Sequence, residues 1–249
     1  REKMEDSMKS LKNYIIPKIK TAAEKGYLAR DMTNKREYND VLNILNEARL
    51  DICYDLKSSW KLEDPKLICN YNLENHFIEK RSEMRELGKK DFKEQFCFLV
   101  VPKTAVVDIC QHGLSVKSST ITILGNPQLG VYVFRHIDVA LHYAKMKNSK
   151  SNTIVVFKAL FGRIKKVQPV LNSKKTPLDP APNYDSHMSK KSPSWTDSFE
   201  KQTANSLVYL YEYDQNFKPA DNPRHCLPYA SVSVTFIEQK TEIGPILPT

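Results

Sequence analysis

The chain has 249 residues, 41% of them hydrophobic and 10% aromatic, which is enough to bury a core near the upper size of a single domain. This composition argues against a disordered or fibrous protein. With 14 prolines and 7 glycines, the chain is also unlike an enzyme built on glycine-rich loops. No apolar run approaches the roughly 20 residues of a membrane span, and Arg1 to Lys12 show no apolar secretory stretch. We therefore expect no contact with a membrane.

Positive charge is concentrated in one part of the chain. The net charge is +9, and Lys145 to Lys201 holds 12 Lys and Arg against 4 Asp and Glu. Such a region attracts phosphate backbones by counterion release. Three adjacent pairs are the candidate nucleic-acid contacts: Lys165 and Lys166, Lys174 and Lys175, Lys190 and Lys191. We favour the alternative of a solvated, irregular basic loop over about 167–202, because no interleaved aromatic residues indicate a base-stacking platform. At most weak RNA binding is expected.

Cysteine and histidine spacing predicts no metal site. Five cysteines, most of them in apolar runs, indicate buried free thiols in a reducing compartment: Cys53, Cys69, Cys97, Cys110 and Cys226. Neither Cys110-Gln111-His112 nor His225-Cys226 has the paired spacing of a structural zinc site.

The first third of the chain is predicted to be helical. Within Arg36 to Trp60, apolar residues recur at spacings of three and four: Val41, Leu45, Ala48, Ile52 and Leu56. A second helix is predicted over Asp64 to Leu87, ending at Gly88. Its inward residues are expected to be Tyr71, Phe77, Ile78 and Met84. Residues 1–62 are thus expected to form a helical extension packed on a domain of residues 63–249.

Strands dominate from Phe96 onward. Phe96 to Val101 is a continuous apolar run closed by Pro102, which predicts a buried strand. Helices are predicted over Thr104 to Gln111 and over Ile137 to Lys147. Further strands are predicted from alternation or from β-branched and aromatic content: Thr120 to Leu124, Val131 to Phe134, Thr153 to Phe161, Ser206 to Tyr213 and Ala230 to Ile237. The fold class is therefore α+β.

One constellation resembles a known family. Gly130-Val131-Tyr132-Val133-Phe134, followed by a helix with Ala140-Leu141-His142-Tyr143, resembles the strand and helix motifs of poly(ADP-ribose) polymerase (PARP) catalytic domains. Tyr132 and Tyr143 are eleven residues apart, as in that family. Other pieces match in the family's order: Ile109 to Leu114, Tyr184 to Ser186, Asn205 to Asp214 and Pro228 to Val232. The resemblance, over about Lys66 to Ile237, implies the ADP-ribosyltransferase fold, a split and bent antiparallel sheet with flanking helices and an NAD cleft.

The same resemblance implies that this cleft lacks the residues with which active members bind NAD and transfer ADP-ribose. Active members carry a His-Gly-Thr motif at the end of the first strand, where this chain reads Phe98 to Thr104 without a histidine. His112-Gly113 lies about ten residues too late to replace it. The family's nicotinamide-binding serine corresponds to Ala140, and its glutamate falls in Cys226 to Tyr229, which holds no carboxylate.

We therefore expect a degenerate NAD cleft near Val101, Tyr132, Ala140, Tyr143 and Pro228, with no catalytic residue and no cofactor. Tyr132 and Tyr143 could still stack a ring, but packing in the core is the favoured interpretation. Tyr132, Val133 and Leu141 are accordingly expected to be core residues.

Leu124 to Pro169 is most similar to an inactive branch of the family that belongs to the nuclear silencing complex HUSH. That similarity implies a non-enzymatic role at chromatin, in the repression of retroelements and transgenes through histone methylation. The implied partners are a chromodomain subunit and periphilin, bound mostly by other regions of the full protein. Two alternatives stay open: a mono-ADP-ribosyltransferase with an atypical site, and a single-stranded RNA-binding module.

Overall fold

The structure is a computed structural model that describes residues 28–31, 35–50, 60–88, 91–147, 152–171, 176–214 and 216–237. In these ranges nine strands form one sheet, in the order β1-β2-β9-β5-β3-β4-β8-β7-β6. The strands are β1 (Leu28–Asp31), β2 (Trp60–Cys69), β3 (Asp91–Val101), β4 (Val131–Phe134), β5 (Thr153–Gly162), β6 (Ile164–Val167), β7 (Ser186–Ser189), β8 (Leu207–Leu210) and β9 (Cys226–Phe236). All neighbours are antiparallel except β6 and β7.

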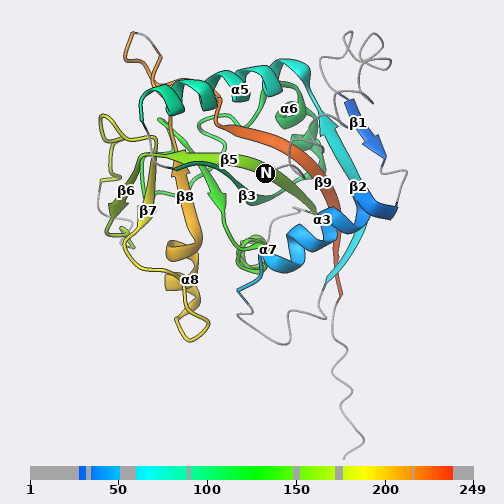
Figure 1. The fold of residues 1–249 in the computed structure, drawn as a ribbon. Helices are drawn as coiled ribbons and strands as arrows, with labels where there is room; N and C mark the ends of the chain where they lie inside the picture. Colours follow the sequence, from blue (N-terminus) through cyan, green and yellow to red (C-terminus); the bar gives the residue numbers. More distant parts are fainter. Residues whose placement is uncertain are drawn as a thin grey trace, which may run out of the picture.

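The sheet is split between β3 and β4. These two strands are joined at a single pair, Phe98 with Phe134, whereas β3 follows β5 from Asp91 to Val101 and β4 follows β8 along its full length. The larger half, with β9 and β5, and the smaller half, with β8, β7 and β6, lie side by side in Figure 1. The α+β class and the split, PARP-like sheet are therefore confirmed.

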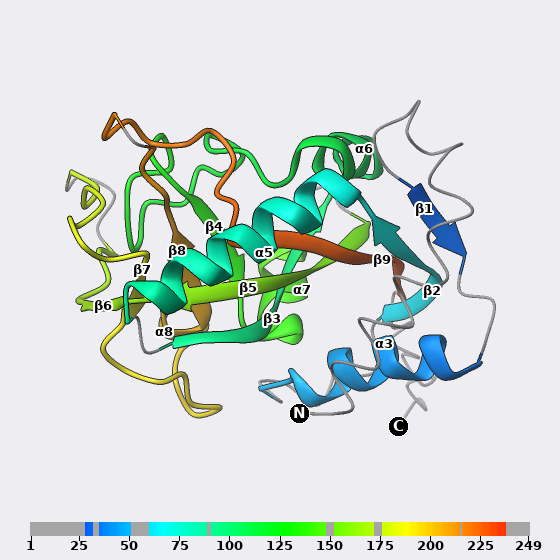
Figure 2. The same cartoon turned by 45° about the horizontal axis from the view of Figure 1, so that its top comes forward.

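Helices cover the sheet on both sides. They are α3 (Lys35–Glu47), α5 (Tyr71–Glu86), α6 (Lys103–His112), α7 (Ile137–Met146) and α8 (Phe199–Ser206). Because successive strand residues point to opposite faces, β4 divides its side chains between two cores. Tyr132 and Phe134 pack in the core of α7 and α3, while Val131 and Val133 pack in the core of α6. Helix α5 crosses the sheet beside β9 (Figure 2) and buries Phe77 and Met84 there.

The prediction of a helical first third is wrong at three places, the first of which is the strand β1. The first helix ends at Glu47, and Trp60 begins β2 rather than ending a helix. The second helix starts at Tyr71 instead of Asp64, because the Asn70 side chain caps it by accepting from the amides of Asn72 and Leu73. Of its expected inward residues, Phe77 and Met84 are buried, but 61% of Tyr71 and 39% of Ile78 are exposed.

Strand β2 passes through the boundary predicted between residues 62 and 63, so residues 60–62 belong to the sheet. Its pattern was hidden by a register shift between Glu63 and Lys66, where Asp64 adopts a positive φ of 50°. Pairing with β1 on one side and β9 on the other holds this irregular strand. A separate N-terminal extension stays a prediction, and Ile52 and Leu56 lie outside the described residues.

Later elements follow the prediction closely, with two exceptions. Strands β3, β4, β5 and β9 and helices α6 and α7 all lie where the apolar patterns placed them. Thr120 to Leu124 forms no strand, because its backbone groups bond to scattered partners and not to one neighbouring strand. The Ile121 amide bonds to the Ser119 hydroxyl, the Ile123 carbonyl to the Val170 amide and the Leu124 amide to the Tyr132 hydroxyl. The basic segment 167–202 is not an irregular loop throughout, since it contains β7 and the start of α8. Its local sequence is polar, and β7 is recognisable only through its pairing with β6 and β8.

Candidate functional site

The split beside β4 is the first candidate site, and Tyr132 lies at its centre. Tyr132 is 1% exposed. Its hydroxyl donates to the carbonyl of Gly125 at 2.6 Å and accepts from the amides of Leu124 and Gly125 at 3.0 and 2.6 Å. Burial raises the pKa of Tyr132 above its usual range, although the two amide contacts oppose this shift. The hydroxyl is thus neutral and fully engaged by the protein's own backbone.

A second tyrosine, Tyr209 of β8, also bonds to the backbone that follows Gly125. The Tyr209 hydroxyl donates to the carbonyl of Asn126 at 2.7 Å, and its ring centroid lies 5.0 Å from that of Tyr132. Gly125 is required there, because a Cβ on this residue would lie 2.3 Å from the Tyr209 ring. His187 of β7 adds a contact of 2.8 Å from Nδ1 to the carbonyl of Leu124. Residues 124–126 are therefore clamped onto the sheet, and we call them the clamped segment.

Helix α7 contributes the other predicted residues on this side. Ala140 is 1% exposed and packs in the same core as Tyr132. Tyr143 is half-buried, with its ring centroid 5.5 Å from that of Phe134 and the ammonium of Lys147 5.7 Å from its ring. Tyr132, Val133 and Leu141 are 1%, 0% and 0% exposed, so their prediction as core residues is confirmed.

The remaining two predicted residues lie in the other half of the sheet. Val101 ends β3 opposite Thr153 of β5, and Pro228 of β9 lies opposite Phe157 of β5. Thr153 and Phe157 are four residues apart, which places Val101 and Pro228 roughly 13 Å apart along the strand direction. The structure thus gathers Tyr132, Ala140 and Tyr143 around β4 and α7. It does not place Val101 and Pro228 at the same position along the strands.

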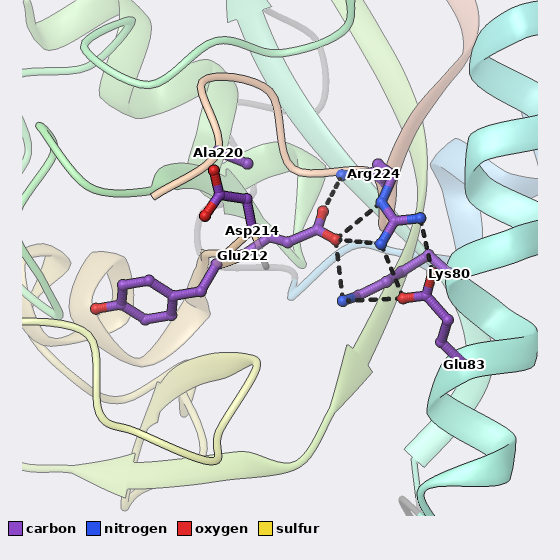
Figure 3. A pocket seen from close by; sticks show the side chains of 7 residues that line it. Lys80, Glu83, Glu212, Asp214, Ala220 and Arg224 are labelled. Carbon is purple, nitrogen blue, oxygen red and sulfur yellow. Dashed lines mark hydrogen bonds and ion pairs between the residues drawn. The ribbon is translucent and has the colours of Figure 1, made fainter. Parts of the chain in front are cut away.

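A second polar site lies between α5 and the chain that connects β8 to β9. A cavity of about 530 Å³ opens there. Figure 3 shows its lining side chains, which come from α5 and from this connection: Lys80, Glu83, Glu212, Tyr213, Asp214, Ala220 and Arg224.

Arg224 is the centre of an ion network that joins these two segments. Its Nη1 and Nη2 each donate to one carboxylate oxygen of Glu83 at 2.8 Å. Its Nε and Nη2 lie 2.9 and 2.8 Å from Oε1 of Glu212, and its amide donates to Oε2 at 2.7 Å. The Lys80 ammonium lies 3.0 Å from the same Oε1. Only 3% of the Glu212 side chain is exposed, so the network neutralises a buried carboxylate.

Titration of Glu212 is shifted accordingly. Burial by itself raises its pKa, but the charges of His225 and Lys80 and the hydrogen bond from the Arg224 amide outweigh burial and lower the pKa to about 2. Each guanidinium nitrogen of Arg224 already contacts a carboxylate. We assign the network the role of fastening α5 to the β8–β9 connection. Its partners Arg224 and Glu83 are 141 residues apart, and no motif in the sequence signals it.

Two of the three lysine pairs lie close to each other. Lys165 and Lys166 are on β6, and Lys190 and Lys191 directly follow β7, the strand paired with β6. Lys174 and Lys175 lie outside the described residues.

Four cysteines are free and buried, as predicted: Cys69, Cys97, Cys110 and Cys226. Cys53 is outside the described residues. Within the described ranges, no three His, Cys, Asp or Glu side chains gather as a metal ion would require, and no helix there is long and apolar enough to span a membrane.

Comparison with known proteins agrees with this geometry. Residues 81–228 match the family described as "Protein of unknown function (DUF3715)". The crystal structure of the TASOR pseudo-PARP domain superposes with a TM-score of 0.71 at 31% identity, covering 85% of this chain and 99% of that one. The chain belongs to the family of the TASOR pseudo-PARP domain. Mouse and human TASOR are each 34% identical to it over 239 and 236 residues, and TASOR of Xenopus laevis is 30% identical over 233 residues.

These TASOR relatives are much longer than the chain. The matches cover 90%, 90% and 87% of this chain but 14% of each relative. The TASOR resemblance therefore concerns one domain. The family match of residues 81–228 begins within α5 and ends within β9, so it includes β3 to β8, the clamped segment and Glu83, Glu212 and Arg224 of the ion network.

Proposed function

We propose that this domain is a pseudoenzyme, a PARP-like fold that does not transfer ADP-ribose and serves a nuclear silencing assembly. The observation that carries the proposal is the state of the Tyr132 hydroxyl. Its three backbone contacts, all between 2.6 and 3.0 Å, occupy the group at the centre of the family motif. Ala140 supplies no hydroxyl, and the stretches Phe98 to Thr104 and Cys226 to Tyr229 lack the histidine and the glutamate that the resemblance places there.

The energetic consequence is a weak or absent site for NAD. Each ligand polar group left unpaired in a dry cleft costs roughly 1–3 kcal/mol. Without the histidine and serine contacts, the affinity for NAD falls by about two decades or more. The buried faces of Tyr132 and Ala140 support a packing role for both in place of ligand binding.

The proposed biological role is HUSH-dependent silencing of retroelements and transgenes in the nucleus, through repressive histone methylation at chromatin. Similarity to TASOR over 90% of the chain supports it. The proposed protein partners are a chromodomain subunit and periphilin. Because the chain covers 14% of the TASOR relatives, we propose that other regions make most of those contacts.

The test is a thermal melt of the domain with millimolar NAD or a nicotinamide mimic, followed by incubation with labelled NAD. The pseudoenzyme proposal expects an unchanged melting temperature and no label on the protein. Tyr132→Phe is the matched variant, because it keeps the ring and removes only the hydroxyl. A rise of several degrees that this variant abolishes would show an NAD site and contradict the proposal. Transfer of label to the protein would establish the mono-ADP-ribosyltransferase alternative.

A further inference from the structure

A cation-rich surface lies at one edge of the sheet. β6 is the last strand in the sheet order, and it carries Lys165 and Lys166. Parallel pairing sets Val167 of β6 opposite Ser189 of β7, and the amide of Lys190 donates to the carbonyl of Val167 at 3.1 Å. We call Lys165, Lys166, Lys190 and Lys191 the lysine edge. The β6 and β7 strands lie together at one side of Figure 1.

Three of these four lysines have no ion pair within the described ranges. All four lysines are exposed. Lys165, Lys190 and Lys191 form no ion pair with any residue in the described ranges. The carboxylate nearest in sequence to β7, that of Asp185, is 5% exposed and accepts the amide of Arg163 at 2.7 Å. Lys165, Lys190 and Lys191 therefore present positive charge to solvent, in the segment that holds most of the chain's excess charge.

An aromatic ring accompanies the lysines. Tyr184 is 36% exposed, and the Lys165 ammonium lies 5.9 Å from the centroid of its ring. The sequence shows no interleaving of aromatic and basic residues here, because the fold brings this ring from the chain just before β7. A lysine beside an exposed ring is the combination that holds a phosphate and stacks a base.

The backbone that carries the lysines is fixed. The Ser189 hydroxyl donates to Oδ1 of Asn205 in α8 and accepts the amide of Lys191 at 3.2 Å. Ser189 and Asn205 are 3% and 5% exposed. A mobile loop loses conformational entropy when a ligand orders it, and that cost is largely absent here. The entropic cost of ordering a loop therefore does not count against binding at these four lysines.

We propose that the lysine edge binds single-stranded nucleic acid, with phosphates at the lysines and one unstacked base on Tyr184. A duplex keeps its bases stacked and has none to offer to a lone exposed ring, which is why the single strand is favoured. The lysines contact the backbone without reading bases, so binding is expected to show little sequence preference. This proposal does not depend on the absence of NAD binding.

The test is fluorescence anisotropy with a labelled single-stranded RNA of about 20 nucleotides, chosen to exceed the site size of one small module. The logarithm of the association constant should fall with the logarithm of salt at a slope of about −3, since each neutralised phosphate contributes roughly −0.7 on a single strand. Single-stranded DNA and duplex RNA are the comparison probes. Similar binding of both single strands and weaker binding of the duplex is expected.

Two matched variants distinguish binding at the lysine edge from attraction by the overall charge of the protein. Changing the lysine edge to Gln at all four positions should weaken RNA binding more than about ten-fold near physiological salt. The control is the same change at four exposed lysines elsewhere in the fold, Lys93, Lys103, Lys145 and Lys218, which removes equal charge and should change binding by less than about two-fold. Tyr184→Leu should weaken it about five-fold through lost stacking. Thermal melts check that every variant folds.

Three results overturn the proposal. Equal weakening by both four-lysine variants shows attraction by net charge alone. Tighter binding of duplex than of single-stranded RNA, with Tyr184→Leu unchanged, removes the base-stacking role. Competition by polyglutamate as effective as by unlabelled RNA identifies a surface for acidic protein segments instead.

Discussion

The clamped segment and the seam between α5 and the β8–β9 connection are both polar inside the protein, but they satisfy their polar groups differently. Around β4, neutral tyrosine hydroxyls engage backbone groups of residues 124–126. At the seam, Arg224 and Lys80 neutralise the buried carboxylate of Glu212. The comparison indicates that the bonds of the two tyrosine hydroxyls do not depend on charge, because burial raises the pKa of both tyrosines, whereas the attachment of α5 does depend on charge.

Removing the central cation should have the largest effect. Arg224→Ala leaves the Glu212 carboxylate buried, with the Lys80 ammonium at 3.0 Å and the charge of His225 as its remaining partners. Breaking a buried ion network on one side typically costs about 3–5 kcal/mol of the free energy of unfolding. Urea denaturation measures this loss of stability. Lys61→Ala is the control, because its pair with Glu63 at 2.7 Å is exposed and should contribute nothing measurable. Equal effects of the two variants would contradict the assigned role of the network.

Acid should weaken the same seam. The pKa of Glu212 is about 2 in the folded protein and starts from 4.5, so its ionised form stabilises the fold. This contribution to the free energy of unfolding is about 3 kcal/mol. It is complete above pH 4.5 and is lost as the pH falls toward about 2. The measurement is the unfolding free energy of the wild type and of Glu212→Gln across that range. Gln at position 212 should be less stable at neutral pH and should lose less stability on acidification.

A pH profile of the variant that parallels the wild type would show that other carboxylates govern acid unfolding. Tyr132→Phe provides the contrast within the molecule. Burial raises the pKa of Tyr132, which keeps the hydroxyl neutral throughout this range, so that variant should keep the acid sensitivity of the wild type.

Loss of the Tyr132 hydroxyl should have a smaller effect on stability. Tyr132→Phe keeps the ring against Tyr209 but removes the partner of the Leu124 and Gly125 backbone groups. Leaving buried backbone groups unpaired costs about 1–3 kcal/mol. Urea denaturation checks this, and amide hydrogen exchange at 124–126 should become faster. Unchanged stability and exchange would mean that the clamped segment is held without this hydroxyl.

The two regions also differ in what the sequence could predict. The short apolar run Val131 to Phe134 and the helix after it carry their own pattern, and a family motif marks them, so β4 and α7 were placed within a residue or two. β2 was missed because its register shift at Glu63 is imposed by β9. The ion network was missed because Glu83 and Arg224 belong to distant segments, and ion pairs leave no periodic pattern.

Adding a hydroxyl to α7 should have the smallest effect. Ala140→Ser replaces a residue that is 1% exposed with one that can bond back to a carbonyl of the preceding helical turn, so the free energy of unfolding should fall by less than about 1 kcal/mol. It should not create an NAD site, because the Tyr132 hydroxyl remains engaged by residues 124 and 125. A thermal melt with NAD measures this. If Ala140→Ser alone gave a shift that grows with NAD concentration, the engaged Tyr132 hydroxyl would not be what prevents NAD binding, and a single hydroxyl on α7 would separate this domain from a nucleotide-binding one.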